Sequence, residues 1–299
     1  MDSVRRMTTR TLGPFTVGSI AFGCWRLTTP STEEATTLVE AALDLGCNLV
    51  DTADVYGLDW GGTGFGSCEE RLGAILSARP GLRTRMVLAT KGGIIPGVPY
   101  DSSPSAITAA CEASLRRLCV DHVDLYQIHR PDMFAHPAEV AGALTSLHER
   151  GLIGCIGVSN HSAAQVSALQ AHLALPIVSV QNEFSAAHVT PLRDGTLDQA
   201  MQHGFAMLAW SPLARGAIPT GDGLRVELTE ALDRIAADRG ADRSTVALAF
   251  VLSHPSAPVA IIGTQRAERI RAAVAAAALR LERSEVYAIV QAAEGVRLP

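Results

Sequence analysis

Several familiar kinds of site are missing from this sequence of 299 residues. Its nine histidines form no H-x-H or H-E-x-x-H cluster, which argues against a metal-dependent hydrolase, and we predict no metal ligands. No G-x-S-x-G motif is present, so a serine nucleophile of that type is not expected. None of the six cysteines forms a C-x-x-C pair, and we expect reduced thiols in a cytoplasmic protein. The cysteines are Cys24, Cys47, Cys68, Cys111, Cys119 and Cys155.

Long apolar runs and basic clusters are also missing. No stretch approaches the roughly 18 apolar residues that a membrane-spanning helix needs. The arginine-containing N-terminus has no apolar segment that would make it a signal peptide. The net charge is −5 and no basic run exceeds two residues, which excludes a typical nucleic-acid surface. We therefore expect neither membrane nor nucleic acid as a partner.

Lysine is almost absent. Of the 25 basic residues, 24 are arginines and one is Lys91. An ammonium group is a compact charge whose pKa the surroundings can tune, whereas a guanidinium is neither compact nor tunable. Lys91 therefore marks a place where arginine does not serve, unless it is a chance survivor of biased codon usage. Composition alone leaves both interpretations open.

The order of predicted elements indicates the fold class. Strands alternate with helices, and helix starts are marked by Ser31-Thr-Glu-Glu34, Ser103-Pro104 and Ser162 with Gln165. The strands are expected at residues 17–22, 47–51, 86–90, 123–128, 153–158, 177–180, 205–209 and 259–262. Such alternation predicts a parallel sheet. Eight strands without a break in composition favour a single α/β domain over residues 1–299, a (β/α)8 TIM barrel.

Two details refine this prediction. We expect a short extended lead-in at residues 8–12 and extra helices near the C-terminus, at residues 224–237, 267–279 and 284–293. An open doubly wound sheet is the alternative, but G-x-G-x-x-G does not follow the first strand. The glycine-rich run at residues 61–66 has the wrong spacing for a phosphate loop, so we interpret it as a flexible loop.

Polar residues stand where predicted strands end. Asp51, Lys91 and His129 end the second, third and fourth strands, and Tyr56 follows Asp51 by five residues. In a barrel these ends meet at one mouth, where chemistry gathers. Each residue alone has an ordinary explanation, as a helix cap, a surface histidine or a packed ring. Their convergence around the only lysine favours a catalytic site.

These four side chains suit proton transfer to a carbonyl oxygen. A free tyrosine has a pKa of about 10, and an ammonium about 4 Å away contributes up to roughly 4 kcal/mol at an effective dielectric of 20. Lys91 is therefore expected to lower the pKa of Tyr56, by at most about three pH units. Asp51 would hold Lys91 charged, and a neutral His129 would orient the substrate oxygen. Reduction would need a cofactor, and a Schiff-base aldolase with Lys91 as nucleophile stays open.

The motifs around these residues resemble those of the aldo-keto reductases. The resemblance runs from about residue 18 to residue 273, and is closest to bacterial reductases that are similar to potassium-channel β subunits. In chain order the motifs are Asp51-Thr-Ala-Asp-Val-Tyr56-Gly57, Ser67-Cys-Glu-Glu-Arg-Leu-Gly73, Asp124-Leu-Tyr-Gln-Ile-His129-Arg-Pro-Asp132, Gly157-Val-Ser-Asn160, Gln181-Asn-Glu183, Trp210-Ser-Pro-Leu213 and Ile262-Gly-Thr264.

The resemblance implies a barrel that binds NADPH/NADP+ without a Rossmann domain and reduces a small-molecule aldehyde or ketone. It makes Tyr56 the general acid, supported by Asp51, Lys91 and His129. The positions that match nicotinamide contacts are Ser159, Asn160, Gln181 and Trp210. The positions that match the pyrophosphate contacts are Ser211, Leu213 and Gly216. Those that match the contacts with the adenosine 2′-phosphate are Gly263, Thr264, Gln265 and Arg269.

Three further expectations concern this chain in particular. Trp25 and Trp60 are expected to line the substrate pocket. Trp60 lies in a segment after Tyr56, residues 58–66, that is unusually long. Ala273 replaces an asparagine often found on the adenine side. The resemblance also leaves open a cofactor-sensing regulatory protein of the channel β-subunit type, and the oligomeric state is left open.

Overall fold

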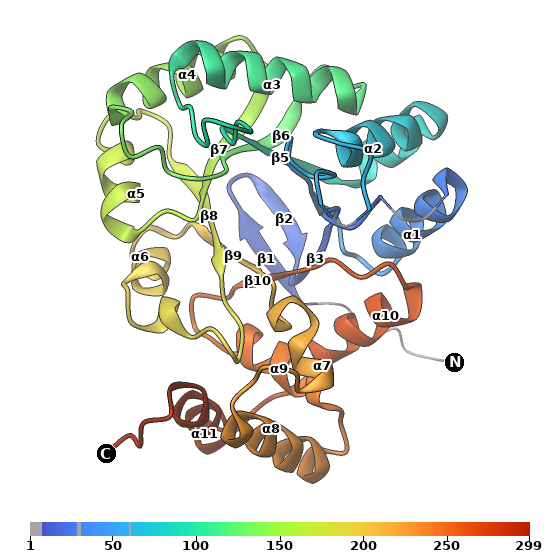
Figure 1. The fold of residues 1–299 in the computed structure, drawn as a ribbon, viewed down its shortest axis with the longest axis vertical. Helices are drawn as coiled ribbons and strands as arrows, with labels where there is room; N and C mark the ends of the chain where they lie inside the picture. The colour runs from blue at the N-terminus through green and yellow to red at the C-terminus, as the bar shows by residue number, and fades with distance from the viewer. Residues whose placement is uncertain (1–7, 29–30, 60) are drawn as a thin grey trace.

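A closed barrel of eight parallel strands forms the centre of the structure (Figure 1). The structure is a computed structural model that describes residues 8–28, 31–59 and 61–299. Around the barrel the strands follow the order β10, β3, β4, β5, β6, β7, β8, β9, which confirms the predicted TIM barrel. They are β3 (Ile20–Gly23), β4 (Leu49–Asp51), β5 (Val87–Gly92), β6 (Val123–Ile128), β7 (Ile153–Ser159), β8 (Ile177–Glu183), β9 (Ala206–Trp210) and β10 (Val259–Ile262).

Helices surround the barrel, and further helices lie towards the C-terminus, as predicted (Figure 1). Ser31 and Ser162 form capping boxes with Glu34 and Gln165, so these side chains satisfy backbone N–H groups that the first turn leaves free. The helices are α1 (Thr32–Asp44), α2 (Ser67–Ala78), α3 (Pro104–Leu118), α4 (Pro137–Glu149), α5 (Ala163–Gln170), α6 (Thr196–His203), α7 (Ala217–Thr220), α8 (Val226–Arg239), α9 (Arg243–Leu252), α10 (Ala267–Ala276) and α11 (Arg283–Glu294).

The prediction of a single first strand over residues 17–22 is wrong. β1 (Thr9–Leu12) and β2 (Phe15–Gly18) form an antiparallel hairpin, and the first barrel strand begins only at Ile20. Gly13, which takes a φ of 54°, and the following proline form the turn between β1 and β2. This Gly-Pro signal was overlooked because residues 17–22 were interpreted as one strand, although Gly18 and Ser19 separate β2 from β3.

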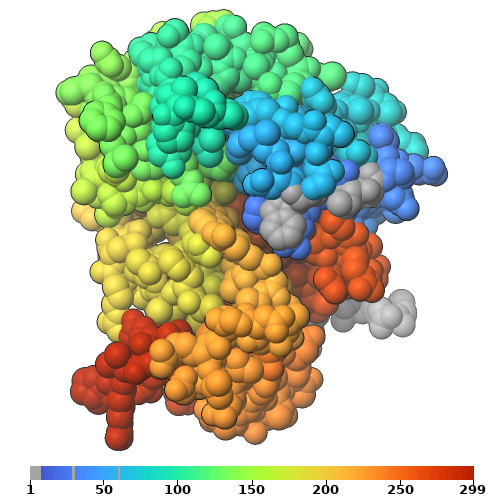
Figure 2. Space-filling model, viewed as in Figure 1, coloured from blue at the N-terminus to red at the C-terminus, as the bar shows by residue number. Residues whose placement is uncertain are grey.

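The hairpin closes one end of the barrel. Leu12 and Val17 are fully buried against inner residues such as Leu49 and Leu208, and the hairpin is visible through the ring of strands in Figure 1. Because apolar side chains fill this end, the polar groups inside the barrel gather at the other end, where the strands finish. The segment after β9 and the loop after β4 flank the hollow on that face (Figure 2).

Candidate active site

A cleft of about 790 Å³ lies at the C-terminal ends of the strands. Nearly all the residues predicted for the site line it. They are Trp25, Asp51, Tyr56, His129, Ser159, Asn160, Gln181, Trp210, Ser211, Leu213, Gly216, Gly263, Thr264, Gln265 and Arg269. Lys91 lies behind the cleft wall and is fully buried, while Trp60 lies outside the described residues. Ala273, where an asparagine is common in the family, lines the cleft as well.

Lys91 is held by two oxygens. Its Nζ donates to Asp51 Oδ2 at 2.7 Å and to the carbonyl oxygen of Thr52 at 2.8 Å. The same nitrogen lies 4.9 Å from the centre of the Tyr56 ring. A buried ammonium is tolerated when it is paired and hydrogen-bonded, which is the case here. The only lysine of the chain therefore stands beside the predicted proton donor, which disfavours the chance-survivor interpretation.

The Asp51 carboxylate is fixed from its other side by two amides. Asp51 Oδ1 accepts hydrogen bonds from Gln181 Nε2 at 2.9 Å and from Gln127 Nε2 at 3.3 Å. Sequence analysis missed Gln127, although a glutamine in the otherwise apolar end of β6 was a usable signal. Because these bonds orient Asp51, they also determine where Lys91 can place its charge.

The pKa of Tyr56 moves in the direction opposite to the one predicted. Burial raises it to about 12, and the charge and hydrogen bond of Lys91 counteract only part of this effect. The prediction of a lowered pKa was wrong because it counted the ammonium and not the loss of solvent around the phenol. Burial tends to lower the pKa of Lys91, but Asp51 and Tyr56 together raise it. Tyr56 is therefore a protonated phenol beside a charged ammonium at neutral pH.

His129 is neutral and lies against the tyrosine. Burial, followed by the charges of Lys91 and Arg130, holds the pKa of His129 well below 6.5. Its ring meets the Tyr56 ring edge-on with centroids 5.8 Å apart, and Trp25 lies 6.5 Å from Tyr56. Tyr56 thus faces the cleft between a neutral imidazole and an aromatic wall.

The predicted nicotinamide residues form one hydrogen-bonded group. Asn160 Nδ2 donates to the carbonyl oxygen of His129 at 3.0 Å, and its Oδ1 accepts from Trp210 Nε1 at 3.1 Å. Ser159 Oγ donates to the carbonyl oxygen of Gln181 at 2.8 Å. Asn160 adopts a φ of 59°, a conformation that asparagine tolerates better than most residues. These bonds tie the ends of β6, β7, β8 and β9 into one rigid wall.

The far end of the cleft carries an unsatisfied amide and positive charge. Both Gln265 Oε1 and Gln265 Nε2 are buried, and neither has a hydrogen-bond partner in the part of the chain that the structure describes. Arg266 and Arg269 line the same end and are exposed. A buried polar group without a partner is costly, so the Gln265 amide suits a ligand that hydrogen-bonds to it.

Three arginines at the mouth were not predicted as site residues. Arg26, Arg130 and Arg215 all line the cleft. Arg215 lies 5.5 Å from the Trp210 ring and 3.7 Å from Glu183. Because the sequence uses arginine for nearly all its cations, no single arginine stood out.

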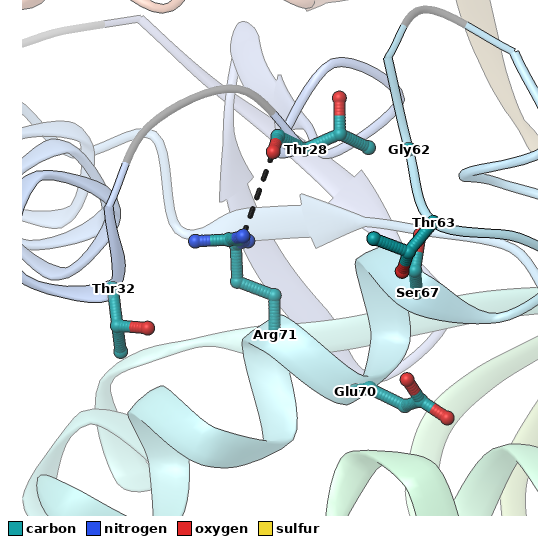
Figure 3. A pocket seen from close by; sticks show the side chains of 7 residues that line it. All are labelled: Thr28, Thr32, Gly62, Thr63, Ser67, Glu70 and Arg71. Carbon is teal, nitrogen blue, oxygen red and sulfur yellow. Dashed lines mark hydrogen bonds between the residues drawn. The ribbon is translucent and has the colours of Figure 1, made fainter.

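A second pocket, of about 230 Å³, lies between the segment after β3, the glycine-rich run and the start of α2 (Figure 3). Arg71 reaches into it and donates to the carbonyl oxygen of Thr28 at 3.5 Å. Gly62 and Thr63 of the glycine-rich run line this pocket, whereas no described residue of that run lines the large cleft. The other lining residues are Thr32, Ser67 and Glu70. The pocket contains none of the predicted catalytic residues.

Metal-binding clusters and membrane-spanning helices are both absent from the described residues. Within residues 8–28, 31–59 and 61–299, no group of three or more histidine, cysteine, aspartate or glutamate side chains could hold a metal ion. No helix in this part of the chain is both long and apolar enough to cross a membrane.

Comparison with known proteins places these observations in a family. The Aldo/keto reductase family profile matches residues 19–294. The 6-dehydroglucose reductase of Novosphingobium aromaticivorans is 44% identical over 288 residues, which cover 95% of this chain and 94% of that protein. The 6-dehydroglucose reductase of Agrobacterium fabrum is 34% identical, over 90% of this chain and 93% of that protein. An aldo/keto reductase from Klebsiella pneumoniae, solved with NADP and acetate, is similar with a TM-score of 0.79 at 26% identity, over 96% of this chain and 95% of that one.

Proposed function

This chain belongs to the aldo/keto reductase family, and from that premise we propose that it reduces an aldehyde with NADPH, using Tyr56 as proton donor. The observation that carries the proposal is the arrangement of Asp51, Lys91 and Tyr56. A buried ammonium, paired with one carboxylate, lies beside a phenol that faces a cleft of about 790 Å³.

The cleft fits a nicotinamide dinucleotide. The unpartnered amide of Gln265 offers a donor and an acceptor, and Arg269 offers positive charge for a 2′-phosphate. Gly216 takes a φ of 103°, and a side chain added there would meet no atom within 4 Å, so backbone is open to a ligand at this point. Ser159, Asn160, Gln181 and Trp210 would hold the nicotinamide. Ser211, Leu213 and Gly216 would hold the pyrophosphate, and Gly263 and Thr264 would join Gln265 and Arg269 at the 2′-phosphate. When bound, NADPH supplies a hydride to the carbonyl carbon.

The protein's own groups act on the carbonyl oxygen. Tyr56 keeps its proton at neutral pH and releases it only to a strong base, such as the alkoxide that forms on reduction. Lys91 then stabilises the phenolate that remains, and Asp51 keeps Lys91 in place. A neutral His129 beside Tyr56 orients the same oxygen by a hydrogen bond without competing as an acid.

We further propose a sugar-sized, hydroxylated aldehyde as substrate. The relative that is 44% identical is a 6-dehydroglucose reductase, and we extend that substrate class to this chain. The mouth combines the Trp25 ring with the charged groups of Arg26, Asp59 and Arg130, and this mixture suits a sugar, which has both apolar faces and hydroxyl groups.

NADPH consumption tests the proposal. We expect turnover with an aldehyde on a hydroxylated ring at a kcat/KM at least about tenfold above that for unbranched aldehydes of similar length. Tight NADPH binding with no turnover on any carbonyl would instead favour the regulatory alternative. The aldolase alternative is disfavoured because a charged, buried Lys91 is a poor nucleophile, and borohydride trapping of a substrate on Lys91 would reinstate it.

The acid side of the pH profile follows from His129. Its neutral form is the functional one and its pKa is held well below 6.5, so activity is lost only as the pH falls through that lowered value. We therefore expect kcat for reduction to stay constant as the pH falls from about 7.5 through about 6.5. A break near pH 6.5 in a steady-state profile would contradict this. The pKa of Tyr56 is raised to about 12, and Asp51 and Tyr56 raise that of Lys91, so a break at mildly alkaline pH would come from another group.

Arg269 is predicted to set cofactor choice. A bidentate contact with a phosphate is worth about 1.5–3 kcal/mol, or roughly ten- to a hundredfold in affinity. Arg269→Ala should therefore weaken NADPH binding at least about tenfold and leave NADH nearly unchanged. Arg271→Ala is the matched control, because Arg271 is exposed on the same helix and does not line the cleft. Cofactor titrations that follow Trp210 fluorescence measure both, and equal weakening of the two cofactors would contradict the assignment.

A further inference from the structure

A second group of buried charges lies behind the catalytic wall. Asp54 is 2% exposed and stands two residues before Tyr56, and its backbone N–H donates to the carbonyl oxygen of Lys91 at 3.0 Å. Its Oδ1 is buried and has no hydrogen-bond partner among the described residues. The carboxyl group is thus built into the turn that carries Tyr56, yet the mechanism above does not use it.

The charges around Asp54 do not balance. Glu69 on α2 is fully buried and pairs with Arg117 on α3, whose nitrogen lies 2.7 Å from Glu69 Oε2. Thr90 on β5 donates to the other oxygen of Glu69, so this carboxylate is satisfied. The Arg117 guanidinium is therefore the cation for two buried carboxyl groups, those of Glu69 and Asp54. Since a buried charge without a partner is strongly destabilising, one of the two acids must be neutral.

Asp54, not Glu69, is the carboxyl group that is protonated and neutral. Glu69 is already paired with the Arg117 guanidinium and accepts a hydrogen bond from the Thr90 hydroxyl. Among the described residues, no cation and no hydroxyl is paired with Asp54 in this way. Lys91 on β5 is paired with Asp51. Burial, followed by the Glu69 charge, raises the pKa of Asp54 to about 8, although Arg117, the backbone N–H of Val55 and Lys91 act in the opposite direction. The remaining titratable groups nearby, Tyr126 on β6 and Cys111 on α3, are neutral because burial raises the pKa of each.

We propose that Asp54 is a positioning residue that works as a neutral acid, and that loss of its proton to solvent displaces the Tyr56 turn and lowers turnover. An ionised Asp54 is repelled by the Glu69 carboxylate, and among the described residues Arg117 and Lys91 are already paired with other acids. This repulsion acts on the segment that holds Tyr56. This role rests on the proposed function. It predicts an alkaline break that neither Tyr56 nor Lys91 produces.

The test compares the intact protein with two variants. Asp54→Asn replaces a neutral acid with an amide of the same shape. The matched control is Asp121→Asn, because Asp121 is exposed and precedes β6 at the opposite end of the barrel. We expect the wild type and the control to lose about tenfold in kcat between pH 7 and pH 9, since one pH unit above the pKa leaves roughly a tenth of the acid protonated. Asp54→Asn should keep its pH 7 activity at pH 9. A break that persists in Asp54→Asn would overturn the proposal.

Two measurements do not depend on turnover. Infrared titration should show one protonated carboxyl that ionises near pH 8 in the wild type and is missing in Asp54→Asn. Thermal unfolding is a second measurement, and the direction in which its midpoint should change with pH can be derived. In the folded state Asp54 holds a proton that the unfolded chain releases near pH 4, so its contribution to stability falls as the pH rises from about 4 to about 8. The melting temperature of Asp54→Asn should therefore exceed that of the wild type by a margin that grows with pH.

These results separate the two proposals. No turnover on any carbonyl by the wild type would contradict the proposed function. Turnover with the same pH profile in the wild type and in Asp54→Asn, or an ionised Asp54 at pH 7 in the infrared titration, would contradict only the role of Asp54.

Discussion

Tyr56→Phe should lower kcat for carbonyl reduction by about 10²–10⁴-fold while changing NADPH affinity by less than about twofold. The phenol ring lies between Trp25 and His129, and phenylalanine keeps this packing. Only the O–H group is lost, and it acts when the carbonyl oxygen gains charge. An interaction made only in the transition state lowers kcat rather than binding.

Two control measurements test whether the Tyr56→Phe variant keeps its fold and its cofactor site. NADPH titration and thermal unfolding should both match the wild type. Steady-state kinetics that give a near-normal kcat for Tyr56→Phe would show that another group, with His129 the nearest alternative, supplies the proton.

Substitution of Lys91 should damage both activity and stability. In Lys91→Met the Asp51 carboxylate stays buried and loses its cation, a change that typically costs about 3–5 kcal/mol. Without the ammonium, the phenolate of Tyr56 is not stabilised, and kcat should fall by at least about 100-fold. Chemical denaturation and steady-state kinetics measure the two effects separately.

Two further variants distinguish what Lys91 contributes to activity from what it contributes to stability. They are Lys91→Arg and the double variant Lys91→Met with Asp51→Asn. The planar guanidinium is bulkier than the ammonium and does not fit between Asp51 and Tyr56, so Lys91→Arg should lose nearly as much activity as Lys91→Met. Lys91→Met combined with Asp51→Asn removes the unpaired charge, so it should recover stability but not activity. Wild-type kcat in Lys91→Arg would mean that the site needs only a positive charge.

The barrel and its mouth were predictable because both follow local patterns. Strand–helix alternation and serine caps such as Ser31 are visible in the sequence, and Asp51, Lys91 and His129 are spaced by one strand–helix unit each. The hairpin of β1 and β2 was missed because the turn signal at Gly13 was overlooked and β2 was joined to β3 as one strand.

The electrostatics of the site could not be predicted from the sequence. The pKa of Tyr56 depends on how much solvent the fold removes from the phenol, and the sequence does not show this. The shortage of positive charge around Asp54 arises because Glu69 and Arg117, on two different helices, meet behind the Tyr56 turn. Gln127 was overlooked because its contact with Asp51 joins two strands that are far apart in the sequence.

The central claim is that this chain transfers a hydride to a carbonyl carbon. The most direct test incubates the wild-type protein with NADPH deuterated at the transferred position of the nicotinamide and with a hydroxylated ring aldehyde. Mass spectrometry then measures label in the alcohol. We expect one deuterium on the carbon that was the carbonyl, and at least about 100-fold less labelled product with Tyr56→Phe. An unlabelled product, or NADPH binding without any product, would contradict it.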